Sequence, residues 1–338
     1  MCMDFMLDID VPSPAEKINY KDGVMLVGSC FTEHIGNRLQ ALKFDVLQNP
    51  HGILFDPYSV SDSLLSYIRP KDYTIADLFY LNECWQSWQH HSQFSRMDQE
   101  ETLRLIRAAQ RQAHEFLGKT GWLIITLGTA FSYRLSAGLP PGLQGTPGMP
   151  VANCHRAPAQ WFRKHLMTIE EIQSALDNCL HQLFQFNPQL RIIFTVSPVR
   201  HIRDGVIENN RSKARLIEAV HHMVNKFDRL YYFPAYELVV DVLRDYRFYD
   251  VDMVHPNYQA TAFVLEKFTE HFVDGASREI MEALSGIVAA RKHKPFQPDT
   301  LAHQRFLQTQ LEKTRQLKSK YPFLDLEEEL RFFSGNPS

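Results

Sequence analysis

The stretch VMLVGSCFTEHIGNRL, residues 24–39, joins a strand pattern to a helix pattern through one short turn. Its opening apolar run ends at Gly28, and continuous rather than alternating hydrophobicity is typical of a strand covered on both faces. We expect the following helix to begin near Glu33. A buried strand followed directly by a helix is the repeating unit of α/β folds.

Similar apolar runs recur along the chain and alternate with segments of helical spacing. The runs WLIITLG, RIIFTVSP and RLYYFP cover residues 122–128, 191–198 and 229–234. We expect helices at about 33–42, 58–68, 100–117, 168–186 and 209–226. In the fourth of these, one apolar stripe is formed by Ile172, Leu176, Cys179, Leu180 and Leu183. The alternation predicts an α/β fold with a doubly wound, mostly parallel sheet and right-handed crossovers.

Two further segments differ from this pattern. Residues 135–155 carry four prolines and four glycines and are too long for a mere connection, which is typical of a lid or a site wall. After about residue 275 the strand pattern stops and helices of mixed charge follow. We therefore expect an α/β domain at 20–275 and a helical tail or cap at 276–338. The tail carries an apolar stripe that suits packing within the chain better than assembly, and the oligomeric state stays open; the stripe is Leu307, Leu311 and Leu317.

Composition and charge describe a globular chain of 338 residues, with 44% hydrophobic and 22% charged residues. The net charge of -3, from 36 basic and 39 acidic residues, lacks the positive bias that binding a nucleic acid backbone requires. The N-terminal residues show no signal-peptide pattern, and no apolar run approaches the roughly 18 residues of a membrane span. Five cysteines, at positions 2, 30, 84, 154 and 179, lack CxxC spacing and favour a reducing, cytoplasmic compartment.

Ser29 follows the first predicted strand directly. In a parallel α/β sheet, ligands bind outside the carboxyl ends of the strands, and Gly28 permits a tight turn that exposes a nucleophile there. The N-terminus of the next helix also offers free N–H groups to a developing anion. The alternative is that Gly28, Ser29 and Thr32 form only a turn and a helix cap.

Asp252 and His255 lie three residues apart in RFYDVDMVHPNYQAT, residues 247–261. On one ordered turn, this spacing lets the carboxylate orient the imidazole so that the other ring nitrogen can accept a proton. Pro256 restricts the backbone after the histidine, and a helix is expected near Asn257. The alternative is a surface histidine beside a chance acid.

Three segments could polarise a carbonyl through glycine N–H groups or an amide: NPHG, LGTAFSYR and VANCHR, at 49–52, 127–134 and 151–156. Each could equally be a turn. Taken in order with GSCFT, TVSPVRHIRDG and DYRFYDVDMVHP, these segments resemble the GSCFA-domain family, which is similar to the SGNH/GDSL hydrolases. The resemblance covers about residues 20–275. It implies a flavodoxin-like three-layer fold and ester chemistry that needs no cofactor.

The resemblance assigns roles to individual residues. It implies that Ser29 is the nucleophile, that Gly52 matches the glycine of the second block, and that Asp252 and His255 close the site. The third SGNH block reads GxND, whereas this chain has Gly128, Thr129, Ala130 and Phe131, so the expected oxyanion asparagine is absent. Asn153 is the proposed substitute. Thr32 also stands where the family name has alanine.

The expected reaction is hydrolysis or transfer of an O-acyl group through an acyl-enzyme. His255 would deprotonate Ser29, and the N–H groups of Ser29 and Gly52, with the Asn153 amide, would bind the oxyanion. Cys30 is a competing nucleophile, since a thiolate near a helix N-terminus is reactive. The resemblance favours Ser29, and we expect Cys30 to be a small buried packing residue. A catalytically silent module that binds an acylated glycan or lipid is the alternative function, supported by Ala130 in the third block.

Two clusters are candidate substrate contacts. WQSWQHHSQFS supplies aromatic rings for sugars or acyl groups, and SPVRHIRDG supplies cations for a carboxylate or phosphate. Both could instead serve packing or structural ion pairs. A metal is not expected, because the adjacent His90 and His91 lack a spaced third ligand. The substrate is expected to be a small-molecule or carbohydrate ester, and the candidate contacts are Trp85, Trp88, His90, His91, Phe94, Gly128, Thr129, Arg200, His201 and Arg203.

Overall fold

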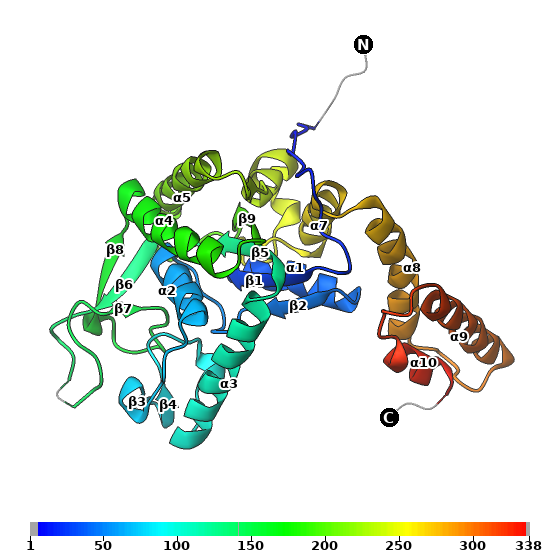
Figure 1. Cartoon of the computed structure of the whole chain (residues 1–338), viewed down its shortest axis with the longest axis horizontal. Coiled ribbons are helices and arrows are strands. Elements are labelled where there is room, and N and C mark those ends of the chain that lie inside the picture. The colour runs from blue at the N-terminus through cyan, green and yellow to red at the C-terminus, as the bar shows by residue number, and fades with distance from the viewer. Residues whose placement is uncertain (1–5, 141, 336–338) are drawn as a thin grey trace, which may run out of the picture.

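A five-stranded parallel sheet forms the centre of the fold (Figure 1). The computed structural model describes residues 6–140 and 142–335, so Cys2 of the predicted free cysteines lies outside it. The strand order is β10-β9-β5-β1-β2, and every neighbouring pair is parallel. The strands are β1 (Gly23–Gly28), β2 (Asp45–Gln48), β5 (Thr120–Leu127), β9 (Arg191–Val196) and β10 (Leu230–Tyr232). The prediction of a doubly wound parallel sheet is confirmed, and the four apolar runs are four of its strands.

Helices cover both faces of the sheet. Along β1, Val24 and Leu26 enter one apolar cluster with α1 and α7, while Met25 and Val27 enter another with α2, α3, α4 and α5. This alternation makes the fold three-layered. The helices are α1 (Cys30–Ala41), α2 (Pro57–Ile68), α3 (Gln99–Leu117), α4 (Ile169–Phe186), α5 (Val206–Lys226) and α7 (Tyr258–Phe272). The predicted stripe of α4 is buried throughout.

Helix α1 begins earlier than expected, at Cys30 rather than near Glu33. Ser29 already has the extended backbone of an N-cap, so the helix starts directly after it. Shorter elements connect the main ones: the helical turn α6 (Ala235–Glu237), a π-helix (Leu238–Leu243), and 3-10 turns at Ile75–Asp77, Ser92–Phe94, Ala159–Trp161, Ile202–Asp204 and Tyr246–Phe248.

Two small antiparallel sheets lie outside the main one. The hairpin pairs β3 (Phe79–Leu81) with β4 (Cys84–Gln86), and the other sheet has the order β7-β6-β8. Its strands are β6 (Phe131–Leu135), β7 (Pro150–Val151) and β8 (Phe162–Leu166). The segment 135–155 was expected to be one loop, but both of its ends pair with each other: Leu135 N–H donates to the Met149 carbonyl and Gly148 N–H donates to the Leu135 carbonyl.

The predicted C-terminal helical region is present as α8 (Gly275–Lys292), α9 (Leu301–Lys320) and α10 (Glu327–Phe333). These helices lie to one side of the sheet (Figure 1). The predicted stripe of α9 packs within the chain, in a cluster that includes Ile287 of α8 and Phe333 of α10. In the part of the chain that the structure describes, no helix is long and apolar enough to cross a membrane.

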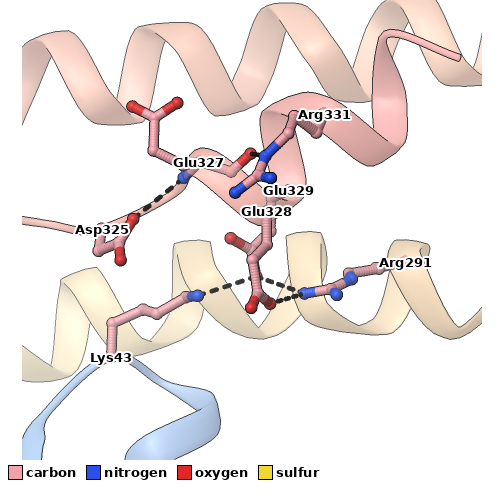
Figure 2. A network of polar contacts seen from close by, with 7 residues as sticks. All are labelled: Lys43, Arg291, Asp325, Glu327, Glu328, Glu329 and Arg331. Carbon is pink, nitrogen blue, oxygen red and sulfur yellow. Dashed lines mark hydrogen bonds and ion pairs between the residues drawn. The ribbon is translucent and has the colours of Figure 1, made fainter. Parts of the chain in front are cut away.

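A polar network attaches α10 to α8 and to the α/β domain (Figure 2). The buried carboxylate of Glu329 lies 3.0 Å from Lys43 Nζ, just after α1, and 3.1 Å from Arg291 of α8. Leu324 and Leu326, before α10, are buried in the same apolar cluster as α1 and α7. The C-terminal region is therefore anchored on the α/β domain by both charge and apolar contact.

Candidate active site

Ser29 lies at the carboxyl end of β1, where the sheet reverses its direction of growth. From β1 the chain adds β2 on one side and β5, β9 and β10 on the other, and ligands of doubly wound sheets bind at this switch point. The turn requires Gly28, whose φ is 142° and whose added Cβ would come within 2.1 Å of the Thr126 carbonyl oxygen. Gly28 therefore brings the backbone of Ser29 close to β5.

The Ser29 side chain is enclosed and unbonded. It is 1% exposed, and its buried Oγ has no hydrogen-bond partner within the described residues. The side chain does not cap α1, so capping does not explain this serine. An unpartnered buried hydroxyl costs free energy unless a ligand or a moved group satisfies it.

Gly128, just after β5, brings three side chains together. A Cβ added to it would lie 3.1 Å from Phe55 Cδ1, 3.3 Å from Ser29 Cβ and 3.4 Å from His201 Nε2. The N–H groups of Gly128 and Thr129 both donate to the Phe55 carbonyl, at 2.8 and 3.1 Å. The proposed nucleophile and the imidazole of His201 therefore meet over the same glycine.

Asp252 and His255 form a hydrogen-bonded pair. Nδ1–H of His255 donates to Oδ2 of Asp252 across 2.7 Å, and Oδ1 accepts the N–H groups of Val254 and His255 at 2.9 and 3.0 Å. These bonds, the His255 side chain first, lower the pKa of Asp252 to about 2. The carboxylate thus stays ionised and fixes the histidine ring, leaving Nε2 as the free proton acceptor.

The turn that carries this pair contacts the segment that carries His201. Arg200 N–H donates to the Val254 carbonyl at 3.2 Å, and the Arg200 guanidinium lies 4.6 Å from the Tyr249 ring centre. His255 is also among the groups that lower the pKa of His201, after burial and Lys213. The Asp252–His255 pair therefore shares one edge of the sheet with Ser29, although no hydrogen bond joins His255 to Ser29 in this conformation.

The proposed oxyanion donors have other partners. Ser29 N–H donates to the Thr126 carbonyl at 3.0 Å, and Gly52 N–H donates to the Asn49 carbonyl at 2.7 Å. Oδ1 of Asn153 accepts the N–H of His155 at 2.9 Å. Both backbone N–H groups are therefore engaged in this conformation.

The aromatic cluster at 85–95 divides into core and edge residues. Trp88 is buried, stacks on Phe79 at 3.6 Å and donates through Nε1 to the Gln144 carbonyl, while His90 is fully buried. His91 is only partly buried and lies beside Gly52, since a Cβ added to Gly52 would come within 2.1 Å of the His91 Cβ. Two predicted contacts of this cluster therefore lie beside proposed oxyanion residues: His91 beside Gly52, and Trp88, whose carbonyl accepts the N–H of Asn153 at 3.3 Å.

Cys30 is a poor nucleophile in this setting. Burial, followed by the charge of Glu33, raises the pKa of its thiol, so it stays protonated at neutral pH. Its side chain packs against the apolar cluster of α1 and α7.

Lys213 of α5 is a feature that the sequence reasoning missed. Its side chain is 1% exposed, and Nζ donates to the carbonyls of Gly128 and Ser197, each at 2.6 Å. Burial lowers its pKa to about 7. The available signal was a lysine in the apolar stripe of a helix, in register with Leu216 and Val220.

Comparison with known proteins gives two family matches. The GSCFA family model matches residues 23–268, and the model of the GSCFA domain protein, C-terminal domain, matches residues 284–335. No curated protein matches the chain. Among solved structures, the crystal structure of a carbohydrate esterase family 3 from Talaromyces cellulolyticus is similar at 9% identity and a TM-score of 0.35, covering 78% of this chain and 99% of that one.

Proposed function

The chain belongs to the GSCFA family, and we propose that it is a serine esterase or acyl transferase that acts on an O-acyl ester. One observation carries this proposal. The unbonded Ser29 hydroxyl lies at the switch point of the sheet, on the same edge as the hydrogen-bonded Asp252–His255 pair. A serine, an oriented histidine and an ionised carboxylate are the groups that acyl transfer requires.

In the proposed mechanism, the turn at 249–256 moves His255 to hydrogen-bond distance of Ser29. Nε2 of His255 accepts the Ser29 proton while Oγ forms a bond to the carbonyl carbon of the ester. The tetrahedral intermediate then expels the alcohol, which leaves with the proton from His255. Water or an acceptor hydroxyl then gives its proton to His255 and attacks the carbonyl of the acyl-enzyme. The second tetrahedral intermediate releases the acyl product, and Ser29 Oγ takes the proton back from His255. Asp252 stays ionised and stabilises the imidazolium at each step.

Substrate access requires a local opening, because Ser29 Oγ is enclosed. The N–H groups of Ser29 and Gly52 would then leave the carbonyls of Thr126 and Asn49 and turn to the oxyanion, with the Asn153 amide as a third donor. We propose a small-molecule or carbohydrate ester as the substrate class. The four described cysteines are free, which supports a cytoplasmic, reducing location for the enzyme.

The second candidate is a catalytically silent module that binds an acylated glycan or lipid. Ala130 in the third block and the two engaged N–H groups favour it, because a working oxyanion site needs free donors. Binding of a short-chain ester without turnover is its expected signature.

A panel of p-nitrophenyl esters and acetylated sugars separates the two functions. Turnover by the native protein, lost in Ser29→Ala, is expected for the esterase. Saturable binding by calorimetry, with turnover no faster in the native protein than in Ser29→Ala, contradicts the enzyme proposal and favours the binding module.

A further inference from the structure

His201 has a position and a charge state that the proposed mechanism leaves unused. It follows β9 on the segment 197–205, and its ring lies next to Gly128, as the Ser29 side chain does. A Cβ built on Gly128 would lie 3.4 Å from His201 Nε2 and 3.3 Å from Ser29 Cβ, so both side chains border the space over this glycine. Its ring also packs edge-on against Phe55, with the ring centres 5.4 Å apart.

Two side chains of α5 hold the backbone around His201 in place. Asn209 of α5 accepts the His201 N–H through Oδ1 at 2.9 Å. Lys213, one turn further along α5, donates to Ser197 at the start of the His201 segment and to Gly128 under the ring. Helix α5 is therefore hydrogen-bonded to the backbone of both the His201 segment and Gly128, and it fixes their relative positions.

The surroundings keep this imidazole neutral. Burial first, and then the charge of Lys213, lower the pKa of His201 to about 4; Asp204 opposes them, and His255 and Lys164 contribute less. A neutral imidazole carries one N–H donor, which can polarise a carbonyl without giving up its proton. A group with so low a pKa is a weak proton acceptor, so it suits this role better than that of general base.

We propose that His201 is a catalytic residue that donates an N–H hydrogen bond from its neutral imidazole to the oxyanion of the acyl-transfer intermediate. This inference rests on the proposed esterase function. It adds a donor to the N–H groups of Ser29 and Gly52 and the Asn153 amide, in a site whose third block carries Ala130 instead of asparagine. No proton is transferred: His201 donates its N–H to the oxyanion only while the carbon is tetrahedral, and the hydrogen bond is lost each time the carbonyl re-forms.

The test compares His201→Gln with His201→Leu. Glutamine keeps an N–H donor and has no basic nitrogen, whereas leucine keeps neither. The readouts are kcat on a p-nitrophenyl ester and the second-order rate of Ser29 labelling by a fluorophosphonate, whose P=O oxygen uses the same donors. His181→Gln, on the exposed face of α4, is the matched control. Urea unfolding of each variant verifies that it is folded.

We expect His201→Leu to lose about 100-fold to 1,000-fold in both rates, as for the loss of one oxyanion donor. His201→Gln should retain at least about a tenth of the native rate and keep the native pH profile on the acid side. Native rates in a folded His201→Leu overturn the inference while the esterase proposal stands. A His201→Gln as slow as His201→Leu, with an altered acid limb, makes His201 the base and also overturns it. If the native protein is labelled no faster than Ser29→Ala, both proposals fail.

Discussion

Replacing Lys213 by methionine should change how stability depends on pH. In the folded protein the pKa of Lys213 falls from 10.5 to about 7, because the ammonium is removed from water. At about 1.4 kcal/mol per pKa unit, burying the charged form therefore costs about 5 kcal/mol. This is a net cost, which already includes the hydrogen bonds from Nζ to the carbonyls of Gly128 and Ser197.

The sign follows from proton binding. Between pH 7 and pH 10.5 the unfolded chain keeps the Lys213 proton while the folded protein has lost it, so the stability of the native protein rises with pH in this window. Below pH 7 both states are protonated and the contribution no longer changes. From pH 7 to pH 9 we expect the native protein to gain about 2 kcal/mol relative to Lys213→Met.

Urea unfolding at pH 7, 8 and 9 measures this difference, because all other titrating groups are shared and cancel. Lys226→Met is the control: Lys226 lies at the end of the same helix with its side chain 44% exposed, so its difference from native should stay constant with pH. A free-energy difference between native protein and Lys213→Met that is the same at pH 7 and pH 9 would show that the pKa of Lys213 is not lowered in the folded protein.

Three further predictions concern the site, the C-terminal anchor and acid stability. The methyl group of Gly128→Ala should displace Ser29 and His201 and lower kcat on an active ester about 10-fold to 100-fold. The unfolding free energy in urea should fall by about 1–3 kcal/mol. An unchanged kcat would count against the close approach of these side chains to Gly128. Lys43→Met should lower unfolding free energy by about 1–3 kcal/mol, because the buried carboxylate of Glu329 loses a cation, and equal urea midpoints would show that the network contributes nothing. Burial lowers the pKa of His51 to about 3 and of His155 to about 4. Because the unfolded chain binds a proton at each histidine before the folded protein does, each should lower the unfolding free energy by about 2–3 kcal/mol as pH falls from 7 to 4.5. Equal unfolding free energies at those two pH values would contradict this.

The central strands could be predicted because they are buried on both faces and form continuous apolar runs. β2 was missed because DVLQ is a short edge strand that is only partly buried, so it carries no such run. The strands β6 and β8 were missed for a related reason: they mix polar and aromatic residues on a small antiparallel sheet, where each strand gives a weak pattern.

Sequence reasoning could place Ser29 at a strand end and Asp252 near His255, since both are local relations along the chain. It could not place His201 beside Ser29 or Lys213 under Gly128, because these contacts join distant segments across the top of the sheet. It also could not reveal that the N–H groups of Ser29 and Gly52 donate to nearby carbonyls, which depends on the conformation of each turn.

Peptide mapping after fluorophosphonate treatment identifies the nucleophile of this site. We expect a single adduct on Ser29 that persists in Cys30→Ser and disappears in Ser29→Ala. An adduct on Cys30, or labelling of Ser29→Ala at the native rate, would contradict it.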